Sequence, residues 1–140
     1  MRALGIDLGS KRIGIAVSDR TGTIASPLGM VPRSGSLRRD HEQIRKLVEE
    51  EEAELLVVGL PLNMNGSSGP AAQAAVKEAD ALATVVGVPV IMFDERRTTV
   101  TADRALIEAG IGAQARRKLV DKVAAAVMLQ NWLDSRAAQR

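Results

Sequence analysis

Four carboxylates in the sequence occupy positions where acidic side chains could hold a metal ion: Asp7, Asp94, Glu95 and Asp121. Asp7 lies near the end of an otherwise apolar segment, and an unpaired carboxylate is costly to bury. Such a group therefore has a counter-charge, a set of hydrogen-bond donors or a metal ion. Because Lys11 and Arg12 follow closely, Asp7 is either half of an ion pair or a ligand of a hard divalent cation.

Carboxylates that gather at one site repel one another, and this repulsion raises the pKa of at least one of them. Hard oxygen ligands suit Mg²⁺ and Mn²⁺, which would remove the conflict. Two such ions about 3.5–4 Å apart can activate a water and stabilise the leaving oxygen of a phosphodiester. No other nucleophile has obvious support: cysteine is absent, and we expect the single histidine, His41, on a helix surface without a functional role.

Five segments have the composition of β-strands: Ala3–Leu8, Ile13–Ser18, Ile24–Val31, Leu55–Leu60 and Val88–Phe93. Short turns separate the first three, which predicts an antiparallel meander with the proline-containing third strand at its edge. The last two are uninterrupted apolar runs, which are typical of buried parallel strands. Three glycines around the first hairpin indicate a close approach to the backbone or a turn with positive φ: Gly5, Gly9 and Gly14.

Four segments predict helices: residues 37–52, 71–86, 99–109 and 118–135. Ser36 is expected to cap the first helix, whose apolar stripe begins at Leu37. Pro70 and Gly87 suit the start and the end of the second helix. Each helix therefore has recognisable boundaries or an amphipathic pattern.

The last predicted helix carries Asp121 at the edge of its expected buried stripe: Val120, Val123, Ala124, Val127 and Met128. As an acid in the first turn, Asp121 could simply complement the helix dipole. Ala124 and Ala125 are small enough to let this turn approach the sheet closely. A close approach would bring Asp121 to the other acids.

A strand meander followed by strands that alternate with helices predicts an α/β fold: a five-stranded mixed sheet, antiparallel on one side and parallel on the other, with helices on both faces. The 140 residues are expected to form one domain, 1–140. In such sheets ligands bind beyond the carboxyl ends of the strands. Asp7, the PLNMNG loop at 61–66 and the acids at 94–95 follow such ends, so we expect them at one edge.

Composition narrows the classes of function. Phe93 and Trp132 are the only aromatic residues, which disfavours recognition of nucleic acid by base stacking. No segment is long enough to span a bilayer, and the absence of cysteine fits a reducing compartment, so we expect a cytoplasmic protein without a membrane partner. The net charge is only +2, but basic clusters gathered on one face would bind a polyanion.

Four ordered motifs closely resemble the YqgF/RuvX family: GIDLGSKRIGIAVSD at 5–19, VVGLPLNMNGSSGP at 57–70, DERRTT at 94–99, and a KxxxDxxAA pattern that begins at Arg117 or Lys118. The resemblance covers essentially the whole chain. That family is described as pre-16S rRNA nucleases or Holliday junction resolvase-like proteins with a ribonuclease H-like fold. The resemblance implies a metal-dependent nuclease in which Asp7, Glu95 and Asp121 match the family's proposed catalytic acids.

The resemblance and the residue types together suggest roles. Asp7 would be shared by two metal ions, Mg²⁺ or Mn²⁺, with Glu95 and Asp121 each completing one site, while Asp94 would support a neighbouring arginine or the outer shell of the site. Phosphate contacts position a substrate without reading its sequence. The expected nucleic-acid contacts are Lys11, Arg12, Asn63, Asn65, Arg96, Arg97, Lys118 and Lys122. Asn65 departs from the aspartate that many members of the family have there, so we expect its loop to shape the substrate groove through its backbone and amides.

The expected activity is hydrolysis of structured nucleic acid, with 5′-end processing of pre-16S rRNA in ribosome biogenesis as the first reading. The alternative is a Holliday junction resolvase that acts on branched DNA as a symmetric homodimer, whereas an rRNA-processing enzyme could be a monomer. A non-catalytic RNA-binding or ribosome-assembly module is a reading from another class. The turn in DLGSKRIG also resembles that of actin-like nucleotide binders, but those proteins need two copies of the fold to enclose ATP, and this chain holds one.

Overall fold

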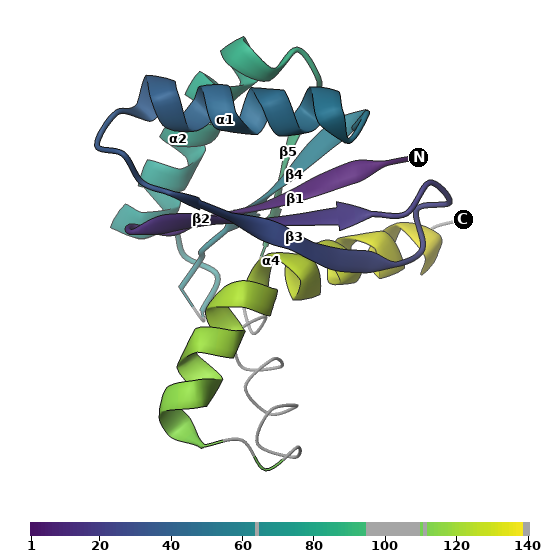
Figure 1. Cartoon of the computed structure of the whole chain (residues 1–140). Coiled ribbons are helices and arrows are strands. Elements are labelled where there is room, and N and C mark those ends of the chain that lie inside the picture. The colour runs from purple at the N-terminus through teal and green to yellow at the C-terminus, as the bar shows by residue number, and fades with distance from the viewer. Residues whose placement is uncertain (64, 95–109, 111, 139–140) are drawn as a thin grey trace.

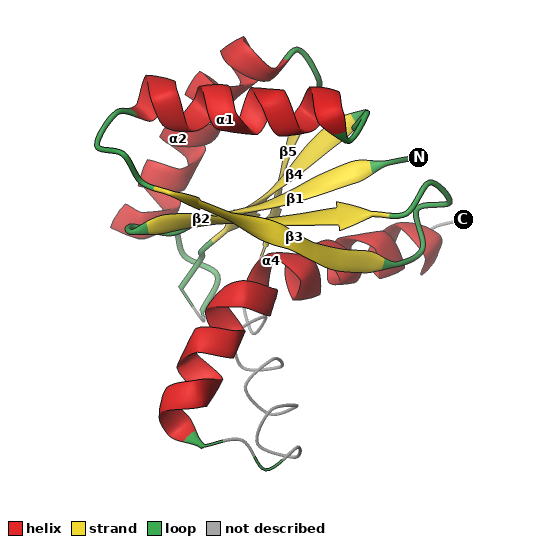
Figure 2. Ribbon diagram, viewed as in Figure 1, coloured by secondary structure: helices red, strands yellow, loops and turns green. Residues whose placement is uncertain are grey.

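The computed structural model describes residues 1–63, 65–94, 110 and 112–138, and within the last helix it describes the side chains of residues 123–137. A five-stranded sheet forms the centre, with strand order β3-β2-β1-β4-β5 (Figures 1 and 2). Strands β1 (Ala3–Leu8), β2 (Arg12–Ser18) and β3 (Ala25–Pro32) form the predicted antiparallel meander. Pro27 lies in β3, at the edge of the sheet, where the missing N–H of proline is tolerated.

Strands β4 (Leu55–Leu60) and β5 (Val90–Asp94) extend the sheet on the other side of β1, and both pairings are parallel. The predicted mixed sheet is therefore confirmed. β5 begins two residues later than predicted, because Gly87 and Pro89 form the turn that precedes it. Since β1, β4 and β5 run in the same direction, their carboxyl ends meet at one edge of the sheet.

Side-chain alternation gives the sheet two apolar faces, each covered by helices as predicted (Figure 2). On one face Leu4 and Ile6 of β1 pack in a cluster with residues of α1 (Leu37–Glu50) and α2 (Pro70–Val86). On the other face Ala3 packs in a cluster with residues of α4 (Ala113–Ala138). The two faces of β1 are therefore distinct environments.

Helix α1 begins at the predicted cap, since the Ser36 hydroxyl accepts a hydrogen bond from the Arg39 N–H at 3.3 Å. It ends at Glu50 rather than at the predicted Glu52, whose positive φ of 53° is incompatible with a continuing helix. Helix α2 has the predicted boundaries: Pro70 lies at its start, and Gly87 ends it with a left-handed φ of 72°.

The predicted buried stripe of α1 is partly wrong. Leu37 is 53% exposed, whereas Asp40 and His41 are each only 3% exposed and line the buried side of the helix together with Ile44. The prediction of His41 as a surface residue is therefore also wrong. The spacing of apolar residues in the sequence does not indicate that these two polar residues are buried, because their hydrogen-bond partners lie outside the helix.

Helix α4 begins at Ala113, five residues before the predicted start, because the basic segment 114–117 consists of good helix formers rather than linker residues. Its buried side chains include the predicted Ala124 and Met128. The second half of the helix, yellow in Figure 1, runs along the sheet face opposite α1 and α2. The helix predicted at 99–109 lies outside the described residues.

Candidate active site

Asp7 lies next to the basic turn of the first hairpin. It sits near the carboxyl end of β1 and pairs in register with Gly14 of β2, which has no side chain to fill the space beside it. A hollow of about 210 Å³ opens there, and its lining residues are Asp7, Gly9, Ser10, Lys11, Arg12, Gly14 and Met30. The predicted proximity of Asp7 to Lys11 and Arg12 is therefore seen in the structure.

The carboxylate of Asp7 belongs to the sheet face that α4 covers. A Cβ atom at Gly5 would lie 2.9 Å from the Leu129 Cβ and 3.1 Å from the Ala125 carbonyl oxygen, so this position faces α4 at very close range. Asp7 is two residues further along the strand and shares that face. The glycines of the hairpin predict that another group approaches the backbone closely. At Gly5 that group is the backbone of α4. The small side chain of Ala125 permits this contact, as the sequence predicts.

Asp94 ends β5 at the same edge of the sheet but on the opposite face. Val90 and Met92 pack against the cluster on the α1/α2 side, and Asp94 continues their alternation, whereas Phe93 packs on the α4 side. β4 separates β5 from β1, so the two strands are about 10 Å apart. Asp94 and Asp7 therefore do not share one face of the sheet.

Several of the predicted site residues lie outside the part of the chain that the structure describes. Glu95, Arg96 and Arg97 follow the end of β5 directly and are among them. Asp121, Lys118 and Lys122 belong to α4, but their side chains are outside the described set. Their roles stay predictions.

The two predicted asparagine contacts order the loop that follows β4. The Asn65 Oδ1 accepts hydrogen bonds from the Ser67 N–H at 2.9 Å and from its hydroxyl at 2.6 Å. The Asn63 Nδ2 donates to the Ser67 hydroxyl at 2.9 Å, and the Asn63 amide packs against Gly69. These side chains hold the loop together, and their predicted contacts with nucleic acid stay predictions.

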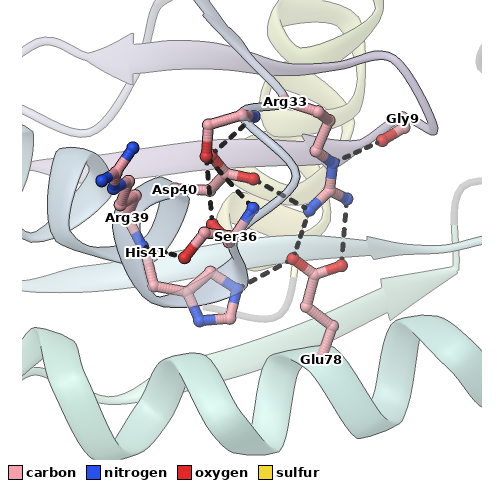
Figure 3. Close-up of polar contacts among 8 residues, drawn as sticks. Gly9, Arg33, Ser36, Arg39, Asp40, His41 and Glu78 are labelled. Carbon is pink, nitrogen blue, oxygen red and sulfur yellow. Dashed lines mark hydrogen bonds and ion pairs between the residues drawn. The ribbon is translucent and has the colours of Figure 1, made fainter.

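A buried polar cluster that the sequence did not reveal lies behind the hairpin turn (Figure 3). The Arg33 guanidinium makes two hydrogen bonds to the Glu78 carboxylate, at 2.7 and 3.0 Å, and its Nε donates to the Gly9 carbonyl at 2.9 Å. The His41 Nε2 lies 2.8 Å from the same carboxylate. The residues come from α1, α2 and the segment after β3, so only the fold brings them together.

Electrostatics within this cluster favour the charged forms. Hydrogen bonding to Glu78 raises the pKa of the Arg33 guanidinium above its usual value. Burial would raise the pKa of the Glu78 carboxyl, but the hydrogen bonds to Arg33 and His41 together outweigh burial and lower it. Asp40 lies beside the cluster, with its Oδ2 4.0 Å from the Arg33 guanidinium, and its Oδ1 accepts hydrogen bonds from the Ser34 N–H at 3.1 Å and hydroxyl at 2.8 Å.

The donor chemistry at the Asp7 hollow fits a hard divalent cation. A half-buried carboxylate lines the hollow and offers the oxygen ligands that Mg²⁺ and Mn²⁺ prefer. Among the described residues, no group of three His, Cys, Asp or Glu side chains lies close enough to hold a metal ion. Asp7 is the one member of the predicted ligand set whose side chain is described.

Solved structures define the class of fold. RuvC of Thermus thermophilus in complex with a Holliday junction substrate superposes with a TM-score of 0.57 over 98% of this chain and 96% of that chain, at 20% identity. Another structure of Thermus thermophilus RuvC gives a TM-score of 0.56 over 99% of this chain and 97% of that chain, at 18% identity. The mixed sheet with helices on both faces is thus a ribonuclease H-like fold, as predicted.

The chain belongs to the RuvX family, since the family model described as "Holliday junction resolvase" matches residues 1–135. A protein of Thermoanaerobacter pseudethanolicus named "Putative pre-16S rRNA nuclease" is 45% identical over 136 residues, which cover 96% of this chain and 97% of that protein. A protein of the same name from Myxococcus xanthus is 47% identical over 135 residues, covering 96% and 89%. The resemblance inferred from the four motifs is confirmed. Across the described ranges, no helix combines the length and the apolar composition needed to cross a membrane.

Proposed function

We propose that this chain is a divalent-metal-dependent nuclease, active as one domain, that hydrolyses phosphodiester bonds of structured nucleic acid. The observation that carries the proposal is the hollow in which Asp7 meets Lys11 and Arg12. A carboxylate that can hold a cation and basic groups that can hold a phosphate are the parts that such a reaction needs in one place. Membership of the RuvX family supports the same conclusion.

The direction of α4 supports Asp121 as a second metal ligand. The last turns of α4 contact the N-terminal methionine, and Ala125 lies over Gly5, so the helix runs antiparallel to β1. Asp121 comes four residues before Ala125, about one turn and about 6 Å along the helix. Two residues beyond Gly5, about 6.6 Å along the strand, comes Asp7. The two acids are thus expected to approach each other at the carboxyl edge of the sheet.

Strand alternation supports Glu95 rather than Asp94 as the third ligand. Asp94 continues the α1/α2 face of β5, opposite the face of Asp7. By the same alternation, the next position along the chain is the one expected on the α4 face. We therefore propose Asp7, Glu95 and Asp121 as the residues that bind Mg²⁺ or Mn²⁺ and carry catalysis.

Each group of residues then has a task. Bound at these acids, divalent ions would supply an activated water and stabilise charge on the leaving oxygen. In this scheme Asp7 would bind both ions, while Glu95 and Asp121 would each complete one of the two sites. Lys11 and Arg12 hold the phosphate beside it, and Arg96, Arg97, Lys118 and Lys122 are proposed to extend this contact along the nucleic acid. Asn63 and Asn65 contribute through the shape of their loop.

We propose the 5′ end of pre-16S rRNA as the substrate, because the relatives that carry this name match nearly the whole chain at 45% and 47% identity. This substrate would place the protein in the cytoplasm, and a monomer would suffice for it. A Holliday junction is the second candidate, favoured by the description of the family. Cutting two related strands of a junction would require a symmetric dimer.

An Asp7→Asn variant tests the proposal. With Mn²⁺ or Mg²⁺, the wild-type protein is expected to cleave a pre-16S rRNA transcript that carries its 5′ extension. Loss of the Asp7 carboxylate should reduce the rate by more than about 100-fold, because changes in the outer shell of a metal site alone cost about 10–100-fold. Thermal stability should be similar, because asparagine has nearly the size and shape of aspartate.

Asp80→Asn is the matched control, because Asp80 is exposed on α2. It should cleave like the wild type. Equal cleavage by the Asp7→Asn and wild-type proteins would refute the proposed site. Faster cleavage of a four-way DNA junction than of the RNA, together with a dimer in solution, would identify the Holliday junction as the substrate instead. Binding of RNA that persists in EDTA, without cleavage in Mn²⁺, would indicate a non-catalytic module.

A further inference from the structure

The Gly9–Arg12 turn is enclosed from two sides. Gly9 and Ser10 line the hollow that contains Asp7, and they also line a second hollow of about 350 Å³ on the α2 side. Arg33 and Glu78 lie in the wall of this second hollow. The turn therefore separates the proposed active site from the buried polar cluster behind it.

Arg33 donates hydrogen bonds to two carbonyl groups of this turn. Its backbone N–H donates to the Lys11 carbonyl at 2.9 Å, and its Nε donates to the Gly9 carbonyl, also at 2.9 Å. These two carbonyls lie two and four residues after Asp7 in the chain. A shift of Arg33 would consequently move the segment that carries both phosphate-binding candidates.

The guanidinium is itself fixed by the helices (Figure 3). Its two terminal nitrogens bind the two oxygens of Glu78, and one of these oxygens also lies 2.8 Å from His41. The side chains of Arg33 and Glu78 are only 17% and 14% exposed. Because all three guanidinium nitrogens are used in one plane, the group has little freedom to rotate.

We propose that Arg33 is a positioning residue for the nuclease site, one that transmits the rigidity of α1 and α2 to the Gly9–Arg12 turn. Glu78 orients Arg33, and Arg33 fixes the turn so that Lys11 and Arg12 present their charges beside Asp7. The inference rests on the proposed function for its effect on catalysis. The order of the turn itself does not depend on that function.

A double variant, Arg33→Met with Glu78→Gln, removes the side-chain bond from Arg33 to the Gly9 carbonyl together with both charges of the Arg33–Glu78 pair. The backbone bond from residue 33 to the Lys11 carbonyl remains. Asp40, whose Oδ2 lies 4.0 Å from the guanidinium, keeps its hydrogen bonds from Ser34. Such replacement of a buried ion pair by neutral residues is often tolerated. The amide introduced at position 78 can still bind His41, while the Gly9 carbonyl loses its donor. Arg33→Lys is the second variant: it keeps a positive charge beside Glu78 but offers one nitrogen in place of three.

Two measurements separate positioning from mere stability. Backbone ¹⁵N order parameters, read by NMR in the folded protein, should fall at residues 10–12 from about 0.85 to about 0.6 or less in either variant, while those of β1 stay at about 0.85. For cleavage of the same RNA in Mn²⁺, kcat per folded molecule should fall about 10- to 100-fold, because small misplacements at an active site have effects of this size.

The control is the same pair of substitutions at a half-buried ion pair on α1, Arg45→Met with Glu42→Gln. Arg45 binds Glu42 and Glu49 on its own helix and does not contact the turn. This control should leave both measurements unchanged. Order parameters at residues 10–12 that match the control in both Arg33 variants would overturn the positioning role. If the wild-type protein cleaves nothing, the proposed function fails, and the order parameters alone then decide the role of Arg33.

Discussion

At the scale of single residues, Glu78 shows how the fold compensates a buried charge. Its carboxylate is largely removed from water, which costs free energy unless hydrogen bonds replace the lost hydration. Arg33 and His41 supply those hydrogen bonds, and together they lower the pKa of Glu78. The carboxylate therefore stabilises the folded state only while it is ionised.

This linkage predicts how a Glu78→Gln variant responds to pH. A carboxyl group whose pKa is lower in the folded than in the unfolded state contributes stability above its unfolded pKa of about 4.5 and loses it as the pH falls through the folded value. At pH 7 the variant should be less stable than the wild type by about 1–3 kcal/mol, because the Arg33 guanidinium loses its charged partner. In urea unfolding, the difference should shrink as the pH falls below about 4.5.

Glu50→Gln provides the comparison, since Glu50 is an exposed glutamate at the end of α1. Its unfolding free energy should stay within about 0.5 kcal/mol of the wild type at each pH. A difference between Glu78→Gln and wild type that grows as the pH falls below about 4.5 would contradict the assigned direction of the Glu78 pKa.

At the scale of elements, the strands of the sheet follow from local sequence patterns. The features that the sequence does not predict depend on contacts between residues far apart in the chain. Strands Ala3–Leu8 and Leu55–Leu60 were predictable residue by residue, because apolar runs, turns and proline are local signals. The cluster around His41 was not, since its partner Glu78 is 37 residues away. The site was predictable as far as Asp7 and the basic turn are concerned, because both belong to one hairpin.

The packing of α4 on β1 yields a prediction at this scale. In a Gly5→Ala variant the new methyl group would lie 2.9 Å from the Leu129 Cβ and 3.1 Å from a backbone carbonyl of α4, so the helix must shift. Overpacking of this kind costs about 1–3 kcal/mol, measurable by urea unfolding. If Asp121 is a metal ligand, cleavage per folded molecule should also fall, because the helix that carries it has moved.

Gly29→Ala is the matched control within the same sheet. Gly29 lies in the edge strand β3, and an added Cβ atom there would meet nothing within 4 Å. Its stability should differ from the wild type by less than about 0.5 kcal/mol, with normal cleavage. Equal stability of both variants would mean that α4 is free to move away from β1 at no cost.

At the scale of the whole molecule, the fold divides the basic residues among different surroundings. Lys11 and Arg12 lie at the carboxyl edge of the sheet beside Asp7. Arg33 is held by Glu78. Arg38 and Arg39 are exposed on α1, on the face of the sheet opposite α4. The small net charge of +2 therefore conceals a local basic site at the proposed nuclease edge.

This division predicts which basic residues bind nucleic acid. Each phosphate contact releases a counterion, so the logarithm of the affinity falls with the logarithm of salt concentration, with a slope of about 0.7–0.9 per contact. Lys11→Gln with Arg12→Gln should flatten that slope by about 1.4–1.8, measured by fluorescence anisotropy of labelled RNA in EDTA between about 50 and 200 mM KCl. Arg38→Gln with Arg39→Gln removes the same charge from α1 and should leave the slope unchanged. The opposite pattern would put the nucleic acid on the α1 face, away from Asp7, and would separate binding from the proposed site of cleavage.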